Sequence, residues 1–188
     1  MNENDLRVQR TRYLLQQALI DLVTSKDYDA VTIRDITRQA RVGYKTFFRH
    51  YPSKEALLQT LIDEVIREFQ AVRLAPETPN APEQNTLTAL RIADHHAPLL
   101  RVIFQSNRAD QLLEPIMALA HQEGKRFFNV ADVPGELVAH HFATSMISLL
   151  HWWLVNEQAY SLEEMADYID RLLIRPLKEL NLFPLEIV

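Results

Sequence analysis

The chain of 188 residues lacks cysteine altogether and contains only three glycines, Gly43, Gly124 and Gly135. Without cysteine there is no disulfide bond, no thiolate ligand for zinc and no cysteine nucleophile. Three isolated glycines cannot form a glycine-rich phosphate loop or a dinucleotide-binding fingerprint. The sequence also has no nucleophile elbow and no HExxH motif. We therefore expect a protein that is not an enzyme and that carries neither a cofactor nor a metal ion.

Strand patterns are also missing, whereas helical periodicity runs through nearly the whole chain. Apolar residues recur at helical spacing over 6–24, 54–73, 83–96, 98–106, 110–128, 135–156 and 161–180. The intervening segment 74–82 holds three prolines and must interrupt the helices beside it. The sequence thus predicts an all-α fold with a domain over 1–54, a connecting helix over 55–73 and a second domain over 83–188.

Residues 32–54 predict two short helices joined by a tight turn. Thr32 caps the first helix, with Asp35 three positions on as a short version of a capping box. Gly43 can begin the second helix without a side-chain clash, and Pro52 ends it because a residue before proline avoids the helical conformation. Two helices in this arrangement form a helix-turn-helix, which lays its second helix in the major groove of DNA.

This stretch resembles the TetR family of bacterial transcriptional regulators. The positions that align with the pattern of the family are Thr32, Ile36, Thr37, Ala40, Arg41, Val42, Gly43, Thr46, Phe47, Phe48, His50, Tyr51 and Lys54. Three of them depart from it, since Arg41 replaces the turn glycine, Gly43 the capping serine, and Phe48 a tyrosine that often bonds phosphate. The resemblance implies an N-terminal three-helix DNA-binding domain and a C-terminal helical domain for ligand binding and dimerisation.

Eight side chains lie on the outer face of the predicted helices and are expected to meet DNA. They are Thr32, Arg34, Tyr44, Lys45, Thr46, Arg49, His50 and Lys54. By analogy with the family, Tyr44 and Lys45 read bases, whereas His50 and Lys54 bind phosphate. Replacement of Lys54 by alanine is expected to reduce the salt dependence of binding by about one unit.

Charge is distributed unevenly along the chain. Residues 1–54 hold ten Lys and Arg against six Asp and Glu, whereas residues 55–188 hold ten against nineteen. A basic domain attracts DNA through counterion release, and an acidic remainder limits indiscriminate binding. The charge pattern therefore agrees with the helix-turn-helix.

The segment from Leu137 to Asn156 contains no Asp, Glu, Lys or Arg, which predicts a helix buried nearly all round. It is too polar for a membrane span. On a helical wheel, one half is apolar and the other is polar but uncharged. The polar half suits a subunit interface or the wall of a ligand pocket. A core helix whose polar groups bond to the backbone is the remaining interpretation.

The ligand pocket is expected beside this polar half. The candidate wall residues are Arg101, Phe104, His141, Ser145, Ser148 and Trp152. They combine aromatic area with a few hydrogen-bonding groups, and Arg101 suits either an anionic ligand or a surface salt bridge. The competing arrangement makes the polar half the dimer interface. The dimer itself is expected to form through 135–156 and 161–180, where a charge at Ala143 or Leu173 should weaken it.

The predicted function is that of a homodimeric transcriptional repressor, which binds a palindromic operator in double-stranded DNA and is released by a small-molecule effector. One alternative is an activator or nucleoid-organising protein of the same fold, and another is a helical interaction or scaffold protein that does not bind DNA. The first twelve residues are polar and charged, unlike a signal peptide. A cytoplasmic protein with no membrane association is therefore expected.

Overall fold

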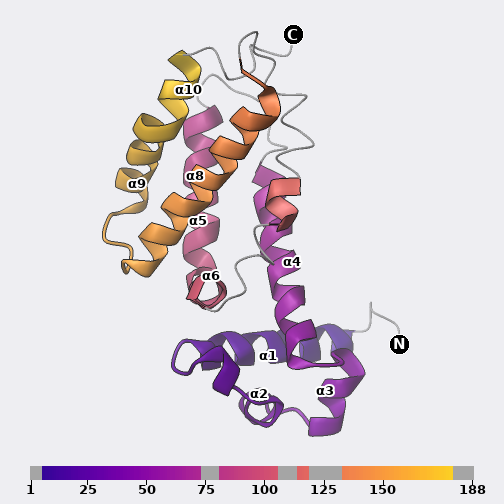
Figure 1. The fold of residues 1–188 in the computed structure, drawn as a ribbon. Helices are drawn as coiled ribbons and strands as arrows, with labels where there is room; N and C mark the ends of the chain where they lie inside the picture. The colour runs from indigo at the N-terminus through magenta and orange to yellow at the C-terminus, as the bar shows by residue number, and fades with distance from the viewer. Residues whose placement is uncertain (1–5, 73–80, 106–113, 119–132, 180–188) are drawn as a thin grey trace.

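The computed structural model describes residues 6–72, 81–105, 114–118 and 133–179, and all regular structure within them is helical (Figure 1). The predicted all-α class is thereby confirmed. The helices are α1 (Leu6–Val23), η1 (Tyr28–Ala30), α2 (Ile33–Gln39), α3 (Tyr44–His50), α4 (Lys54–Val72), α5 (Ala81–His95), α6 (Ala97–Gln105), α8 (Gly135–Val155), α9 (Leu162–Ile169), η2 (Asp170–Ile174) and α10 (Arg175–Glu179). We call α1 to α3 the head and α5 to α10 the body.

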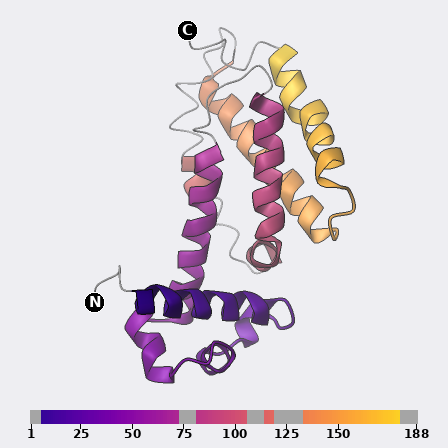
Figure 2. The ribbon, with the colours of Figure 1, turned by 180° about the vertical axis from the view of Figure 1, so that it is seen from behind.

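The head and the body are joined by α4, which stands between them as a column (Figure 1). In the head, α1 lies across the foot of α4, with α2 and α3 on its far side. In the body, α5, α8 and α9 lie side by side, as the view from behind also shows (Figure 2). Helix α6 contacts both α1 and α8, so it forms a second connection between head and body.

A continuous apolar core holds the head to the foot of α4. Its largest fully buried side chains are Leu15, Leu19, Tyr28, Ile36, Phe47, Leu57, Leu58 and Ile62. Each of them stabilises the fold by roughly 1.5–3 kcal/mol relative to an exposed side chain. The position of α3 is therefore determined by its packing against α1 and α2 as well as by the turn that precedes it.

The turn between α2 and α3 contains a strained backbone. Arg41 has a φ angle of 55°, in the left-handed region, as expected for a residue that replaces the turn glycine. This conformation costs a residue with a side chain about 1–2 kcal/mol. Gly43 precedes α3 as its N-cap with a φ of −64° and gives no side-chain hydrogen bond. The backbone at Gly43 is thus one that most residues can adopt.

Several predicted helix boundaries needed correction. Helix α5 begins at Ala81, before the predicted start at residue 83, because Pro82 falls in its first turn, where a missing N–H is tolerated. The single helix predicted over 161–180 contains a π-helical turn, η2, between α9 and α10. The helix predicted over 110–128 lies mostly outside the described residues.

The prediction that α8 is buried nearly all round is wrong for the single chain. Its apolar half does enter the core, since Trp153 and Leu154 are almost completely buried. Its uncharged half faces outward, with Leu137 56% and Trp152 47% exposed. Among the described residues, no helix is long and apolar enough to cross a membrane. The outward half of α8 is therefore available to a partner or a ligand.

Candidate nucleic-acid interface

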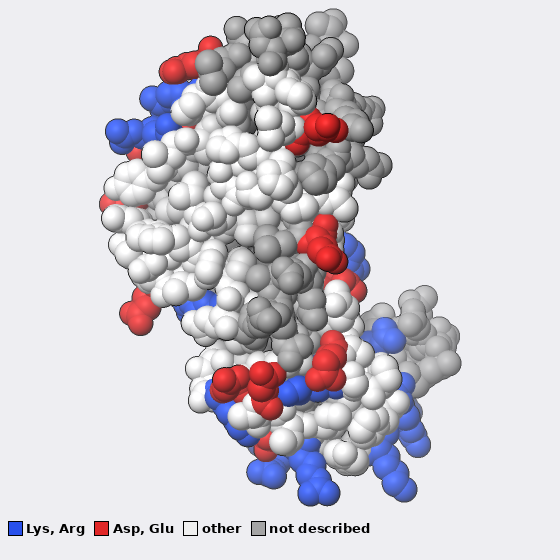
Figure 3. Space-filling view, viewed as in Figure 1, with Lys and Arg blue, Asp and Glu red and all other residues white. Residues whose placement is uncertain are grey.

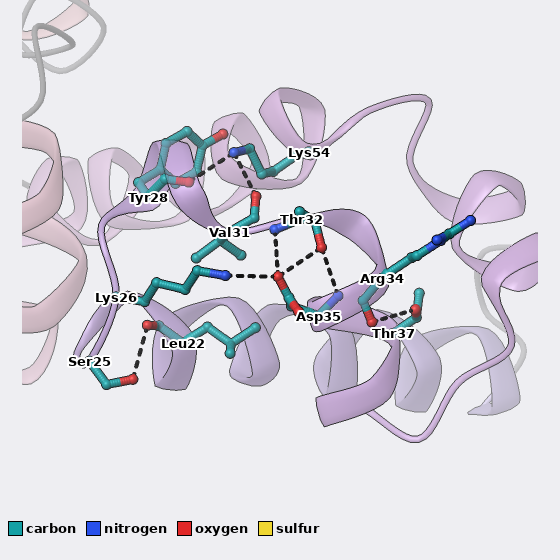
Figure 4. A network of polar contacts seen from close by, with 10 residues as sticks. All are labelled: Leu22, Ser25, Lys26, Tyr28, Val31, Thr32, Arg34, Asp35, Thr37 and Lys54. Carbon is teal, nitrogen blue, oxygen red and sulfur yellow. Dashed lines mark hydrogen bonds and ion pairs between the residues drawn. The ribbon is translucent and has the colours of Figure 1, made fainter.

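The helix-turn-helix begins with the capping box that the sequence predicted. Thr32 Oγ1 accepts a hydrogen bond from the Asp35 backbone N–H at 3.1 Å, and Asp35 Oδ2 accepts one from the Thr32 backbone N–H at 3.0 Å (Figure 4). Lys26 Nζ also donates to Asp35 Oδ2, at 3.0 Å. The hydrogen bonds from Thr32, followed by the one from Lys26, hold the pKa of Asp35 far below its usual range. Asp35 therefore remains an acceptor that fixes the start of α2.

The hydroxyl of Thr32 is already engaged in this cap. It donates to Asp35 Oδ2 at 2.7 Å as well as accepting from the backbone. The predicted contact of Thr32 with the DNA backbone stays a prediction, and the structure gives this side chain a local role that needs no DNA. Arg34, by contrast, is exposed and points away from the capping network (Figure 4).

Lys54 connects the start of α4 to the residues that precede α2. Its Nζ donates to the backbone carbonyls of Tyr28 and Val31, at 2.8 Å each, and lies 4.2 Å from the centre of the Tyr28 ring (Figure 4). The sequence analysis assigned Lys54 to a DNA phosphate, and that contact remains a prediction. The observed contacts close the C-terminal end of η1, a role that sequence reasoning missed.

Replacement of Lys54 by methionine should destabilise the head. The variant loses charged hydrogen bonds to two carbonyls, at a cost of about 2 kcal/mol in the free energy of unfolding. Chemical denaturation followed by circular dichroism measures the change. Lys45→Met is the matched control, because Lys45 is exposed on α3 and its replacement should leave the unfolding midpoint unchanged. Equal midpoints for the two variants would show that the Lys54 contacts add nothing to stability.

Helix α3 presents a mixed basic and aromatic face to solvent. Tyr44, Lys45 and Arg49 are exposed, Thr46 and His50 are half-buried, and Phe47 is completely buried. Lys and Arg side chains project from the end of the head that lies farthest from the body (Figure 3). Positive charge at the outer end of a helix-turn-helix is the arrangement that DNA binding requires.

His50 differs from the other residues predicted to bind DNA because part of its ring is buried. Burial lowers the pKa of His50, and the positive charges of Arg12 and Arg49 lower it further. The imidazole is therefore neutral at neutral pH. A contact between His50 and a phosphate would be a hydrogen bond from a neutral N–H, without the ionic attraction of a charged histidine.

The six residues predicted to line a pocket in the body make separate contacts. Arg101 Nε donates to the Leu154 carbonyl at 2.7 Å, and its Nη2 donates to Gln158 Oε1 at 3.2 Å. Phe104 stacks on His151, and Trp152 stacks on Tyr160. Ser145 Oγ lies 3.5 Å from His141 Nδ1, and Ser148 is exposed. Arg101 thus fastens α6 to the end of α8.

A cavity of about 370 Å³, largely open to solvent, lies between α4 and α5, and none of those six residues lines it. It is lined by Glu68, Ala71, Val72, Asn85, Thr88 and Ile92. Glu68 also pairs with His96, with 3.1 Å between Oε1 and Nε2. No pattern within α4 or α5 alone indicated this cavity, because three of its residues come from each side of the proline-rich segment.

The head and body together define a helix-turn-helix regulator with a helical C-terminal region. Residues 17–61 match the bacterial regulatory proteins of the tetR family, and residues 80–175 match a transcriptional regulator C-terminal region. The chain belongs to the TetR family of bacterial transcriptional regulators, as its helix-turn-helix sequence predicted.

Individual relatives agree with this assignment. The chain is 30% identical over 169 residues to the HTH-type transcriptional regulator YxbF of Bacillus subtilis, covering 86% of this chain and 44% of YxbF. It is 28% identical over 120 residues to the HTH-type transcriptional repressor KstR of Rhodococcus jostii, covering 64% of this chain and 50% of KstR. The chain thus spans half the length or less of the curated relatives it matches.

Solved structures share the fold. NalD, the secondary repressor of the MexAB-OprM multidrug efflux pump in Pseudomonas aeruginosa, superimposes with a TM-score of 0.71 at 15% identity, covering 90% of this chain and 96% of NalD. At this identity the likeness concerns the arrangement of the helices alone.

Proposed function

We propose that the protein is a transcriptional repressor that binds a palindromic DNA operator as a homodimer and is released by a small-molecule effector. In this proposal residues 1–54 bind DNA, and residues 83–188 bind the effector and form the dimer. Residues 55–73 form the helix that connects these two domains. The observation that carries it is the exposed basic face of α3, on a helix-turn-helix with an intact capping box. The relationship to the repressor KstR supports repression rather than activation of transcription.

The outward half of α8 supports the homodimer. It is uncharged and includes exposed Leu137 and Trp152, and η2 adds Leu172, which is 67% exposed. An uncharged surface with apolar side chains suits the centre of a subunit interface. A dimer is also needed to hold two heads about 34–36 Å apart, the distance between successive major grooves on one side of DNA.

For the effector, the cavity between α4 and α5 is better placed than the six wall residues predicted from sequence. Its walls combine apolar Ala71, Val72 and Ile92 with polar Asn85 and Thr88, which is the usual composition of a small-molecule site. It also touches α4, whose other end starts beside the helix-turn-helix. A ligand that changes the position of α4 would change the spacing of the two heads, and so favour a dimer that fits DNA poorly.

Removal of two positive charges from α3 tests the DNA-binding surface. The double variant Lys45→Ala/Arg49→Ala should bind DNA more weakly and lower the salt slope of log Kd by about two units, one for each positive charge removed from beside the phosphates. Fluorescence anisotropy with a duplex from upstream of the gene, titrated over a range of salt concentrations, measures both effects.

The control for this experiment is Arg67→Ala/Arg91→Ala, which removes the same charge from exposed positions on α4 and α5. Its salt slope should equal that of the unaltered protein. Identical slopes for both double variants would place the DNA-binding surface elsewhere. No binding to any duplex by the unaltered protein would favour a helical interaction protein.

A further inference from the structure

Two aromatic rings stand side by side on the exposed face of α3. Tyr44 is 49% and Phe48 is 46% exposed. They lie four residues apart, on the same side of the helix, and their ring centroids are 5.3 Å apart at an interplanar angle of 71°. We call Tyr44 and Phe48 the aromatic pair. About half of the surface of each side chain stays in water after folding, so burial in the core does not explain their placement.

The aromatic pair is held in place from below. The Phe48 ring contacts the ring of Phe47 edge-on, with 5.4 Å between centroids and 77° between planes. Phe47 is completely buried and packs in turn against Tyr51, at 6.0 Å. A row of rings therefore leads from the core to the surface, and it fixes the orientation of the two outer rings before anything binds.

The surroundings of the aromatic pair are basic. Lys45 and Arg49 are exposed on the same helix, and Arg41 is exposed in the preceding turn. An apolar surface among cations suits a partner that carries negative charge around an apolar group. In the major groove of DNA, the C5 methyl of thymine is the one apolar group at the base edges, and phosphates flank it on both sides.

We propose that the aromatic pair packs against thymine methyl groups, so that each operator half-site carries thymine where α3 enters the major groove. This inference rests on the proposed DNA binding. Phe48 has no hydroxyl to offer to a phosphate, and its ring instead supplies the apolar contact together with the ring of Tyr44. The pair thus reads sequence beside Lys45, the other predicted base-reading residue, while Arg49 supplies attraction that is independent of sequence.

Exchange of thymine for deoxyuridine tests the inference, because it removes only the methyl group. Two duplex pools with a randomised central region, one built with thymine and one with deoxyuridine, are selected on the unaltered protein. Sequences retained from the thymine pool should share thymine at fixed symmetric positions. Rebuilding those duplexes with deoxyuridine at the shared positions should weaken binding about fourfold per methyl, and thus roughly fifteenfold for one methyl in each of the two half-sites.

Variants connect this effect to the aromatic pair. Phe48→Ala should bind the thymine and deoxyuridine duplexes almost equally, whereas Phe48→Leu should keep part of the preference for thymine. Tyr13→Ala removes another exposed aromatic residue of the head, at 59% exposure on α1, and should keep the full preference. Thermal unfolding measures whether each variant is folded. Where a variant does not fold, the comparison of thymine and deoxyuridine duplexes with the unaltered protein decides whether thymine methyls are read.

The outcomes separate this inference from the function on which it rests. Equal binding of the thymine and deoxyuridine duplexes by the unaltered protein would overturn the reading of thymine methyls and leave DNA binding intact. A preference for thymine that survives in Phe48→Ala and in Tyr44→Ala would also overturn it. Retention of no sequence from either pool would contradict the proposed DNA binding itself.

Discussion

Replacement of Leu172 by glutamate should convert the proposed dimer into monomers and weaken binding to the proposed operator by about a hundredfold or more. Leu172 is 67% exposed on η2, so a charge there is compatible with the folded chain. In a two-fold interface each substitution occurs twice, and a buried unpaired charge costs about 3–5 kcal/mol. Sedimentation equilibrium measures the dimer dissociation constant, and fluorescence anisotropy measures the accompanying loss of DNA affinity.

Two controls make this experiment specific. Leu6→Glu places the same charge at an exposed apolar residue of α1 and should leave the dimer intact. The positions first expected to test the interface, Ala143 and Leu173, are buried within the single chain at 8% and 3% exposure. A charge at either would disturb folding before it affected association. A monomer at all concentrations of the unaltered protein would rule out the proposed dimer, and a dimeric Leu172→Glu would move the interface away from η2.

Replacement of Phe47 by alanine should lower the free energy of unfolding of the head by about 3–5 kcal/mol. Phe47 is completely buried and contacts the rings of both Phe48 and Tyr51. Its removal leaves a cavity beneath α3 as well as losing the burial of the ring. Urea denaturation followed by circular dichroism measures the loss.

Phe48→Ala is the matched comparison for Phe47→Ala, because it removes the same side chain from the next position of the same helix. Phe48 is 46% exposed, so its loss leaves no closed cavity and should change stability by less than about 1.5 kcal/mol. Similar destabilisation by the two substitutions would mean that Phe47 is not the anchor of α3.

The features that sequence predicted best depend on residues within one helical turn of each other. Thr32 with Asp35 forms the capping box that its spacing indicated, and Ser161 with Glu164, at the same spacing, forms another at the start of α9. Gly43 begins α3 as expected. These rules work because the donor and acceptor are placed by the local backbone alone, before any tertiary packing.

The features that sequence missed join residues far apart in the chain. Lys54 donates to carbonyls 23 and 26 residues away, and Arg101 donates to one 53 residues away. The sequence around a charged side chain does not identify such distant partners. Lys54 was therefore assigned to a DNA phosphate, and Arg101 to either an anionic ligand or a surface salt bridge. The two halves of α8 were separated correctly. Periodicity could not show that the uncharged half faces away from the rest of its own chain.

Helix α4 has the geometry of a lever. It spans 19 residues, or about 28 Å at 1.5 Å per residue. Lys54 fastens one end to η1, while Ala71 and Val72 line the cavity at the other end. A rigid tilt of about 10° would displace one end by about 5 Å relative to the other. Because the helix is long, a small rotation at its body end would therefore move the head by a distance that is significant relative to the groove spacing of about 34–36 Å.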